Sequence, residues 1–99
     1  MFGTIGRARL KNGARAQLDA MMDEWNATIR PKVPGDFINL VGNDAGDPNS
    51  VVFVALARDE RTYRDLANLP EQDAWFRRFM EHVEGEVTWQ DVEMRPANV

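Results

Sequence analysis

Three polar side chains of the sequence are candidates for chemistry. His82 is the only histidine, so it is the side chain expected to titrate near neutral pH, where it can act as a general base. The phenol of Tyr63 can hydrogen-bond to a ligand carbonyl, and the amide of Asn39 can orient a substrate. Each also has a structural alternative, because a histidine near a helix C-terminus favours the dipole and buried polar groups bond within the protein.

A second set of residues could form the walls of a ligand site. Gly6 and Ala8 share a strand face with Thr4, and small side chains beneath a helix leave space unless a neighbour fills it. That space is either a pocket lined by methionines or a gap that their flexible side chains fill. The three tryptophans can stack on a flat ligand or pack the core. The candidate substrate-binding residues are Thr4, Gly6, Met21, Met22, Trp25 and Trp75.

Composition and motifs exclude or disfavour other classes of site. The chain has no cysteine, so disulfides, thiolate metal sites and a cysteine nucleophile are excluded. A net charge of −4 argues against nucleic-acid binding, which requires a basic surface. Neither a leader segment nor a membrane span of about 18 apolar residues is recognisable, and we expect a cytoplasmic protein. No phosphate loop, nucleophile elbow or HExxH motif is present, and we predict no metal and no cofactor.

The positions of apolar residues and turn formers predict the order strand, helix, strand, strand, helix, strand. The second helix is expected to break at Leu69-Pro70, because proline disfavours helix in the residue before it. This order is typical of a ferredoxin-like α+β domain, with an antiparallel sheet and both helices on one face. We predict one such domain over residues 1–95 and a loose tail over 96–99. The expected strands are 1–10, 37–43, 51–57 and 86–94, and the expected helices are 14–30 and a broken second helix over 60–67 and 71–83.

The segment Val51–Ala57 is apolar at every position. A half-exposed strand alternates apolar and polar residues, so a strand that is apolar on both sides requires cover on both faces. The helices can cover one face, and in a 99-residue chain a second copy of the sheet is the simplest cover for the other. The sequence therefore predicts a two-fold homodimer through sheet faces. In it, Arg7 and Arg9 would meet Asp91 or Glu93 of the second copy as an interface ion pair.

Three stretches carry a resemblance to a known family: Arg9–Gly13, Tyr63–Leu66 and Trp75–Val83. Together with the order of the elements and the broken, aromatic-rich second helix, they resemble the antibiotic biosynthesis monooxygenase-like proteins, of the dimeric α+β barrel superfamily. The resemblance covers residues 1–93 and implies a pocket between helices and sheet in each subunit of a dimer. Some members oxidise polycyclic aromatic substrates with O₂ and no cofactor, others degrade haem, and several have no established reaction.

The haem-degrading branch matches this sequence poorly. The resemblance would require an asparagine where the chain has Gly6 and a tryptophan where it has Leu66, and His82 lies nearer the helix end than a haem ligand would. We therefore predict a small-molecule-binding dimer that oxidises a flat aromatic substrate without a cofactor, with Tyr63, Asn39 and His82 as its catalytic residues. The alternative is a non-catalytic ligand-binding or structural dimer. A pocket of about 300 Å³ or more with converging polar groups favours the enzyme.

Overall fold

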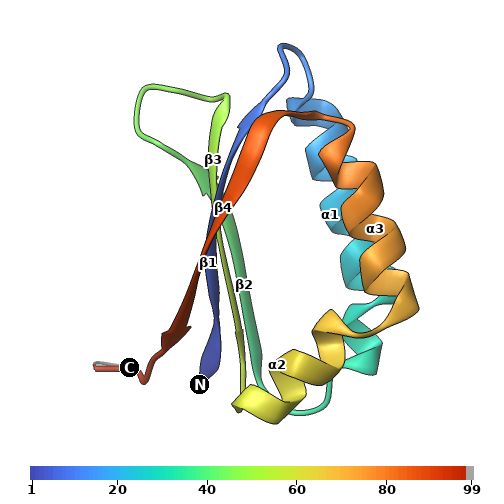
Figure 1. The fold of residues 1–99 in the computed structure, drawn as a ribbon, viewed down its shortest axis with the longest axis vertical. Coiled ribbons are helices and arrows are strands. Elements are labelled where there is room, and N and C mark those ends of the chain that lie inside the picture. The colour runs from blue at the N-terminus through green and yellow to red at the C-terminus, as the bar shows by residue number, and fades with distance from the viewer. Residues whose placement is uncertain (98–99) are drawn as a thin grey trace.

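The computed structural model describes residues 1–97 as one antiparallel sheet with helices on one of its faces (Figure 1). The strands lie in the order β2-β3-β1-β4. A short 3₁₀ turn, η1 (Arg30–Lys32), follows the first helix. The strands are β1 (Phe2–Leu10), β2 (Phe37–Asn43), β3 (Ser50–Ala57) and β4 (Val83–Glu93), and the helices are α1 (Arg15–Thr28), α2 (Glu60–Ala67) and α3 (Pro70–Met80). The expected ferredoxin-like α+β order is confirmed.

The break in the second helix is also where the sequence places it. The Asp59 carboxylate accepts a hydrogen bond from the Thr62 backbone N–H at 2.8 Å and so caps the start of α2. Leu69 is extended, and Pro70 begins α3, where its missing N–H would have had no helical partner. The two short helices therefore follow one another across the sheet at an angle, as Figure 1 shows.

The expected end of the second helix is wrong. α3 ends at Met80, and β4 already begins at Val83, which is buried and pairs with Leu10. Gly85 lies inside β4 with a φ of 73°, close to a register shift in the pairing of β1 with β4. The positive φ of Gly85 therefore belongs to a β-bulge in the strand and not to the end of a helix. Burial of Val83 against the core favours the strand over one more helical turn.

Two close contacts of side chains with the opposite helix hold α1 against α3. The Trp75 indole N–H donates a hydrogen bond to the backbone oxygen of Met21 at 2.8 Å. The Arg78 guanidinium donates hydrogen bonds to both carboxylate oxygens of Glu24, at 2.7 and 3.0 Å. Trp75 is buried at the centre of this packing. The layer of helices is therefore anchored by an indole in the core and an ion pair at the surface.

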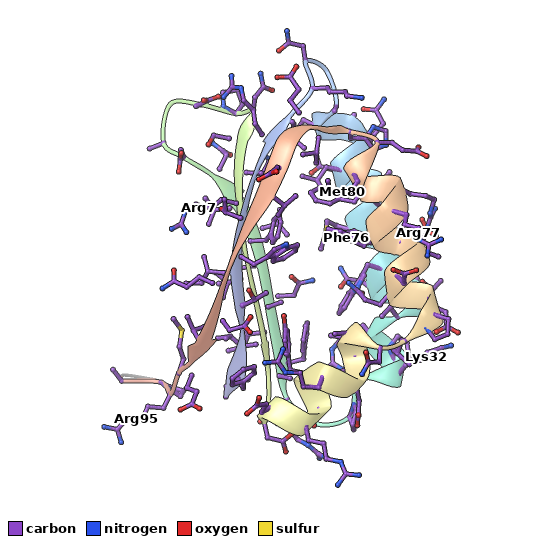
Figure 2. All side chains as sticks on the ribbon, in the orientation of Figure 1. Arg7, Lys32, Phe76, Arg77, Met80 and Arg95 are labelled. Atoms are coloured by element: carbon purple, nitrogen blue, oxygen red, sulfur yellow. The ribbon has the colours of Figure 1, made fainter. Side chains whose placement is uncertain are left out.

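The sheet face turned away from the helices is largely apolar. Cross-strand pairing places Leu40, Val54 and Ile5 in one row on this face, and Leu40 is 62% exposed. Arg7 points outward from the same face (Figure 2). No helix among residues 1–97 is long and apolar enough to cross a membrane.

The expected acidic partners of Arg7 and Arg9 are wrong. Asp91 lies on the helix side of the sheet, where it pairs with Arg64 of α2 at 3.3 Å. Glu93 pairs in register with Phe2 and shares its face. Arg9 already forms an ion pair with Asp47 of its own chain at 3.0 Å.

The expected C-terminal tail is described only in part. Residues 96 and 97 are exposed and outside any strand or helix, and residues 98 and 99 lie outside the described residues.

Candidate functional site

A cavity of about 300 Å³ lies between the helix layer and the sheet. Strands β2, β3, β1 and β4 form one wall, and all three helices contribute to the other. Its surface is mainly apolar, as is typical of small-molecule sites. Eight aromatic residues line it: Trp25, Phe37, Phe53, Tyr63, Trp75, Phe76, Phe79 and Trp89.

Two of the three candidate catalytic residues line this cavity. Tyr63 reaches it from α2 and Asn39 from the edge strand β2, so residues 24 positions apart in the chain face one space. His82 is not part of the wall formed by residues 1–97. It lies in the turn between α3 and β4, where its backbone oxygen accepts a hydrogen bond from the Lys11 N–H at 2.9 Å. The helix ends one turn earlier than expected, and this places the histidine beyond the cavity.

Four of the six candidate substrate-binding residues also line the cavity: Thr4, Met22, Trp25 and Trp75. Met21 is buried in the core, with its backbone oxygen bonded to Trp75. Gly6 lies under the ring of Phe53, its cross-strand neighbour, whose atoms occupy the space that a Cβ would need. The gap over Gly6 is therefore filled by an aromatic ring and not by Met21 or Met22, and the open space lies further along the sheet.

Tyr63 has an environment that keeps its phenol protonated. Burial raises the pKa of Tyr63 above its usual value, the negative charge of Asp91 raises it further, and a side-chain hydrogen bond with Thr4 acts in the opposite direction. The ring of Phe2 packs edge-on against the Tyr63 ring, with centroids 5.4 Å apart. Tyr63 is therefore a hydrogen-bond donor at neutral pH and not a base.

The other polar groups of the wall are amides, one carboxylate and the hydroxyl of Thr4. The Gln72 side-chain oxygen accepts from the Trp25 indole N–H at 2.7 Å, which leaves the amide NH₂ group of Gln72 for a further acceptor. Asn39 forms no side-chain hydrogen bond with another residue of the described chain and is half-buried. The Asp73 carboxylate is paired with Arg77 at 2.8 Å. The wall thus offers several donors and only one charged acceptor.

Sequence reasoning missed part of this wall. Phe37, Phe53 and Trp89 lie on the inner face by strand alternation, and Phe53 and Trp89 are the cross-strand neighbours of Gly6 on its two sides. Alternation alone could have placed them on that face. What it could not show is which inner-face residues surround open space.

Residues 1–97 hold no group of three or more histidine and acidic residues that could bind a metal ion.

Proteins with a similar fold are found among the solved structures. No protein-family model matches the chain, and no curated protein matches it. An antibiotic biosynthesis monooxygenase superposes with a TM-score of 0.78 at 17% identity, covering 97% of this chain and all of the other. A candidate antibiotic biosynthesis monooxygenase from Deinococcus radiodurans gives 0.80 at 15% identity, covering 100% and 97%.

A third structure has an assigned chemistry. SnoaB from Streptomyces nogalater, a cofactor-independent oxygenase, superposes with a TM-score of 0.74 at 16% identity, covering 98% of this chain and 97% of SnoaB. Identities this low relate the chains by their fold alone. The resemblance seen in the sequence is confirmed at that level: the chain has the fold of the antibiotic biosynthesis monooxygenase structures.

Proposed function

We propose that this protein binds a flat aromatic molecule in the cavity and oxidises it with O₂ without a cofactor. The observation that carries the proposal is the cavity of about 300 Å³, whose walls are mainly aromatic and include a few polar side chains. Its aromatic faces suit a planar ring system. The fold shared with SnoaB, a cofactor-independent oxygenase, supports this choice of chemistry.

In such a reaction the substrate supplies the electrons and the protein supplies orientation. With an anthrone, the ring CH₂ group first gives up a proton to solvent, because the cavity wall of residues 1–97 supplies no free base, and the resulting anion reacts with O₂. One oxygen atom ends as the new ketone, and the other leaves as water together with the two hydrogens. Holding the anion beside O₂ in one geometry is the contribution expected of the cavity.

Tyr63 and Asn39 are the side chains proposed to orient that anion. The protonated phenol of Tyr63 would donate a hydrogen bond to the substrate oxygen, where negative charge accumulates. The Asn39 amide, on the opposite wall, would hold the far end of the ring system. His82 lies away from the wall, and the proposal gives it no contact with substrate.

We further propose that a second copy of the chain covers the outer face of the sheet. Ile38 and Leu40 are 38% and 62% exposed there, beside the partly buried Val54 and Ile5. A contiguous apolar patch of this kind marks an interaction surface. Two-fold packing of identical sheets would remove it from water and leave the cavity of each copy on the far side.

The test of the oxidation is oxygen uptake with a panel of anthrones and hydroquinones. We expect consumption of O₂ matched mole for mole by quinone formation. Tyr63→Phe and Asn39→Ala should each lower kcat/KM about tenfold or more, because each removes a donor from a developing oxyanion. His82→Gln serves as the control and should leave kcat/KM unchanged. Absence of uptake with every substrate would contradict the oxygenase proposal.

A non-catalytic ligand-binding protein is the second candidate. The observation that favours it is the absence of a free base on the cavity wall of residues 1–97: Tyr63 is held protonated, and the Asp73 carboxylate is paired. Titration calorimetry with the corresponding quinones separates the two functions. Tight binding together with no oxygen uptake would identify the ligand-binding protein.

A further inference from the structure

The cavity wall reaches the protein surface beside the edge strand β4. The backbones of α3 and β4 stay apart (Figure 1), and the rings of Phe76 and Trp89 bridge the space between them with centroids 5.6 Å apart. Both residues line the cavity, and Figure 2 shows Phe76 pointing from α3 toward the sheet. Because Trp89 is 50% exposed and also lines the cavity, the cavity wall meets solvent at this residue.

Trp89 differs from the other two tryptophans in how it is held. Trp25 and Trp75 are 4% and 9% exposed, and each donates its indole N–H to a partner, at 2.7 and 2.8 Å. Trp89 forms no such bond with any residue from 1 to 97. The first two are fixed by the packing of α1 against α3. The third has an accessible ring face and an unused donor.

A continuous aromatic wall leads inward from Trp89. Its ring lies 5.5 Å from that of Phe53, and Phe53 in turn meets the buried Phe79 at 5.7 Å, edge to face. A planar ligand that enters past the exposed ring of Trp89 would exchange contact with water for contact with ring faces along its whole path. This arrangement favours a ligand that is both flat and extended over several rings.

We propose that the half-exposed Trp89 marks the mouth of the cavity and is the specificity-determining contact there, where the accessible face of its indole stacks on a flat polycyclic aromatic ligand. Its free N–H is in addition available to an oxygen at the outer end of that ligand. The inference rests on the proposed binding function and adds to it the residue that selects ring systems long enough to reach from the inner wall to the surface.

Binding of 9,10-anthraquinone-2-sulfonate tests this contact. The probe is flat, soluble and already oxidised, so that its affinity can be measured without turnover. We expect Trp89→Ala to raise the dissociation constant about tenfold, the usual effect of losing one aromatic stacking partner, whereas Trp89→Phe should change it less than threefold. Thr88→Ala, on the other face of the same strand, is the matched control and should bind like the parent protein.

A second measurement covers the case in which Trp89→Ala fails to fold. The three tryptophans give three indole N–H signals in a ¹H–¹⁵N spectrum, and the one lost in Trp89→Phe belongs to Trp89. That signal should shift more than the other two as the probe saturates the protein. Equal affinity of a folded Trp89→Ala variant, or an unmoved Trp89 signal at saturation, would overturn the inference alone. Failure of the parent protein to bind the probe would overturn the binding function and this inference with it.

Discussion

At the scale of single residues, side chains of the same type have different tasks because their surroundings differ. Trp75 is buried and hydrogen-bonded between two helices, whereas Trp89 is half exposed at the end of the cavity. Tyr63 lines the cavity with a raised pKa, and His82, the residue type most often chosen for catalysis, lies outside it. From residue type alone, all of these residues are candidates for a functional role. The burial of each side chain and its hydrogen-bond partners distinguish one from another.

The contrast between the tryptophans predicts that the same substitution has a large effect on stability at Trp75 and a small one at Trp89. Trp75→Phe removes the hydrogen bond to the Met21 oxygen and part of the ring that fills the core, so it should lower the free energy of unfolding by about 1–3 kcal/mol. Trp89→Phe removes no hydrogen bond within residues 1–97 and should change it by less than about 0.5 kcal/mol. Urea unfolding followed by circular dichroism measures both. Equal destabilisation would show that Trp89 is also structural.

The raised pKa of Tyr63 predicts a loss of stability in alkali. The folded protein holds the phenol proton more tightly than the unfolded chain does, so the contribution of Tyr63 is complete below pH 10, the ordinary pKa of the group, and is lost as the pH rises through the higher folded-state value. The free energy of unfolding should therefore fall more between pH 9 and about pH 11 for the parent protein than for Tyr63→Phe. Identical alkaline profiles would contradict a raised pKa.

At the scale of elements, glycine and proline decide where strands approach and where helices stop. Pro70 separates α2 from α3, and Gly85 bends β4 at its bulge. Gly3 serves a third purpose: a Cβ at this position would overlap the backbone of Ala55 and Leu56 in the neighbouring strand. The pairing of β1 with β3, at the centre of the sheet, therefore requires a residue without a side chain.

Two strand glycines form a matched pair for testing this requirement. Gly3→Ala should destabilise the protein by about 1–3 kcal/mol or more, because its methyl group meets backbone atoms that can move only if the strands separate. Gly42→Ala places a methyl group where nothing lies within 4 Å, and it should be neutral or stabilising by up to about 1 kcal/mol. Thermal unfolding distinguishes the two. A destabilising Gly42→Ala of equal size would assign the effect to glycine in general.

At the scale of the whole molecule, helices cover one face of the sheet and leave the other face uncovered within the single chain. The helix face holds the core and the cavity, and the outer face exposes Ile38 and Leu40. The proposed dimer and the proposed ligand site therefore lie on opposite sides of one four-stranded sheet. A substitution at the proposed dimer interface need not change the ligand site directly, so the two proposals can be tested separately.

The proposed dimer is tested by a charge on the outer face. Leu40→Lys should raise the dimer dissociation constant at least tenfold, because the ammonium group would lose its hydration at the interface, while the fold persists. Ala27→Lys, on the exposed side of α1, is the control and should leave assembly unchanged. Sedimentation velocity over a range of concentrations gives the answer. A monomeric parent protein at tens of micromolar would contradict the dimer.

The sequence by itself determined the order of the elements. Apolar spacing, Asp59 and Pro70 act through contacts within a few residues, and such local effects can be read along the chain. The sequence-based prediction was wrong at the end of α3, where burial of Val83 against Leu10, 73 positions away, favours a strand over a further helical turn. Only the tertiary structure decided that Phe53 covers Gly6, that His82 lies outside the cavity and that Trp89 is half exposed in the cavity wall. These outcomes depend on strand register and on which side chains fill a shared volume, and neither is encoded within any one segment.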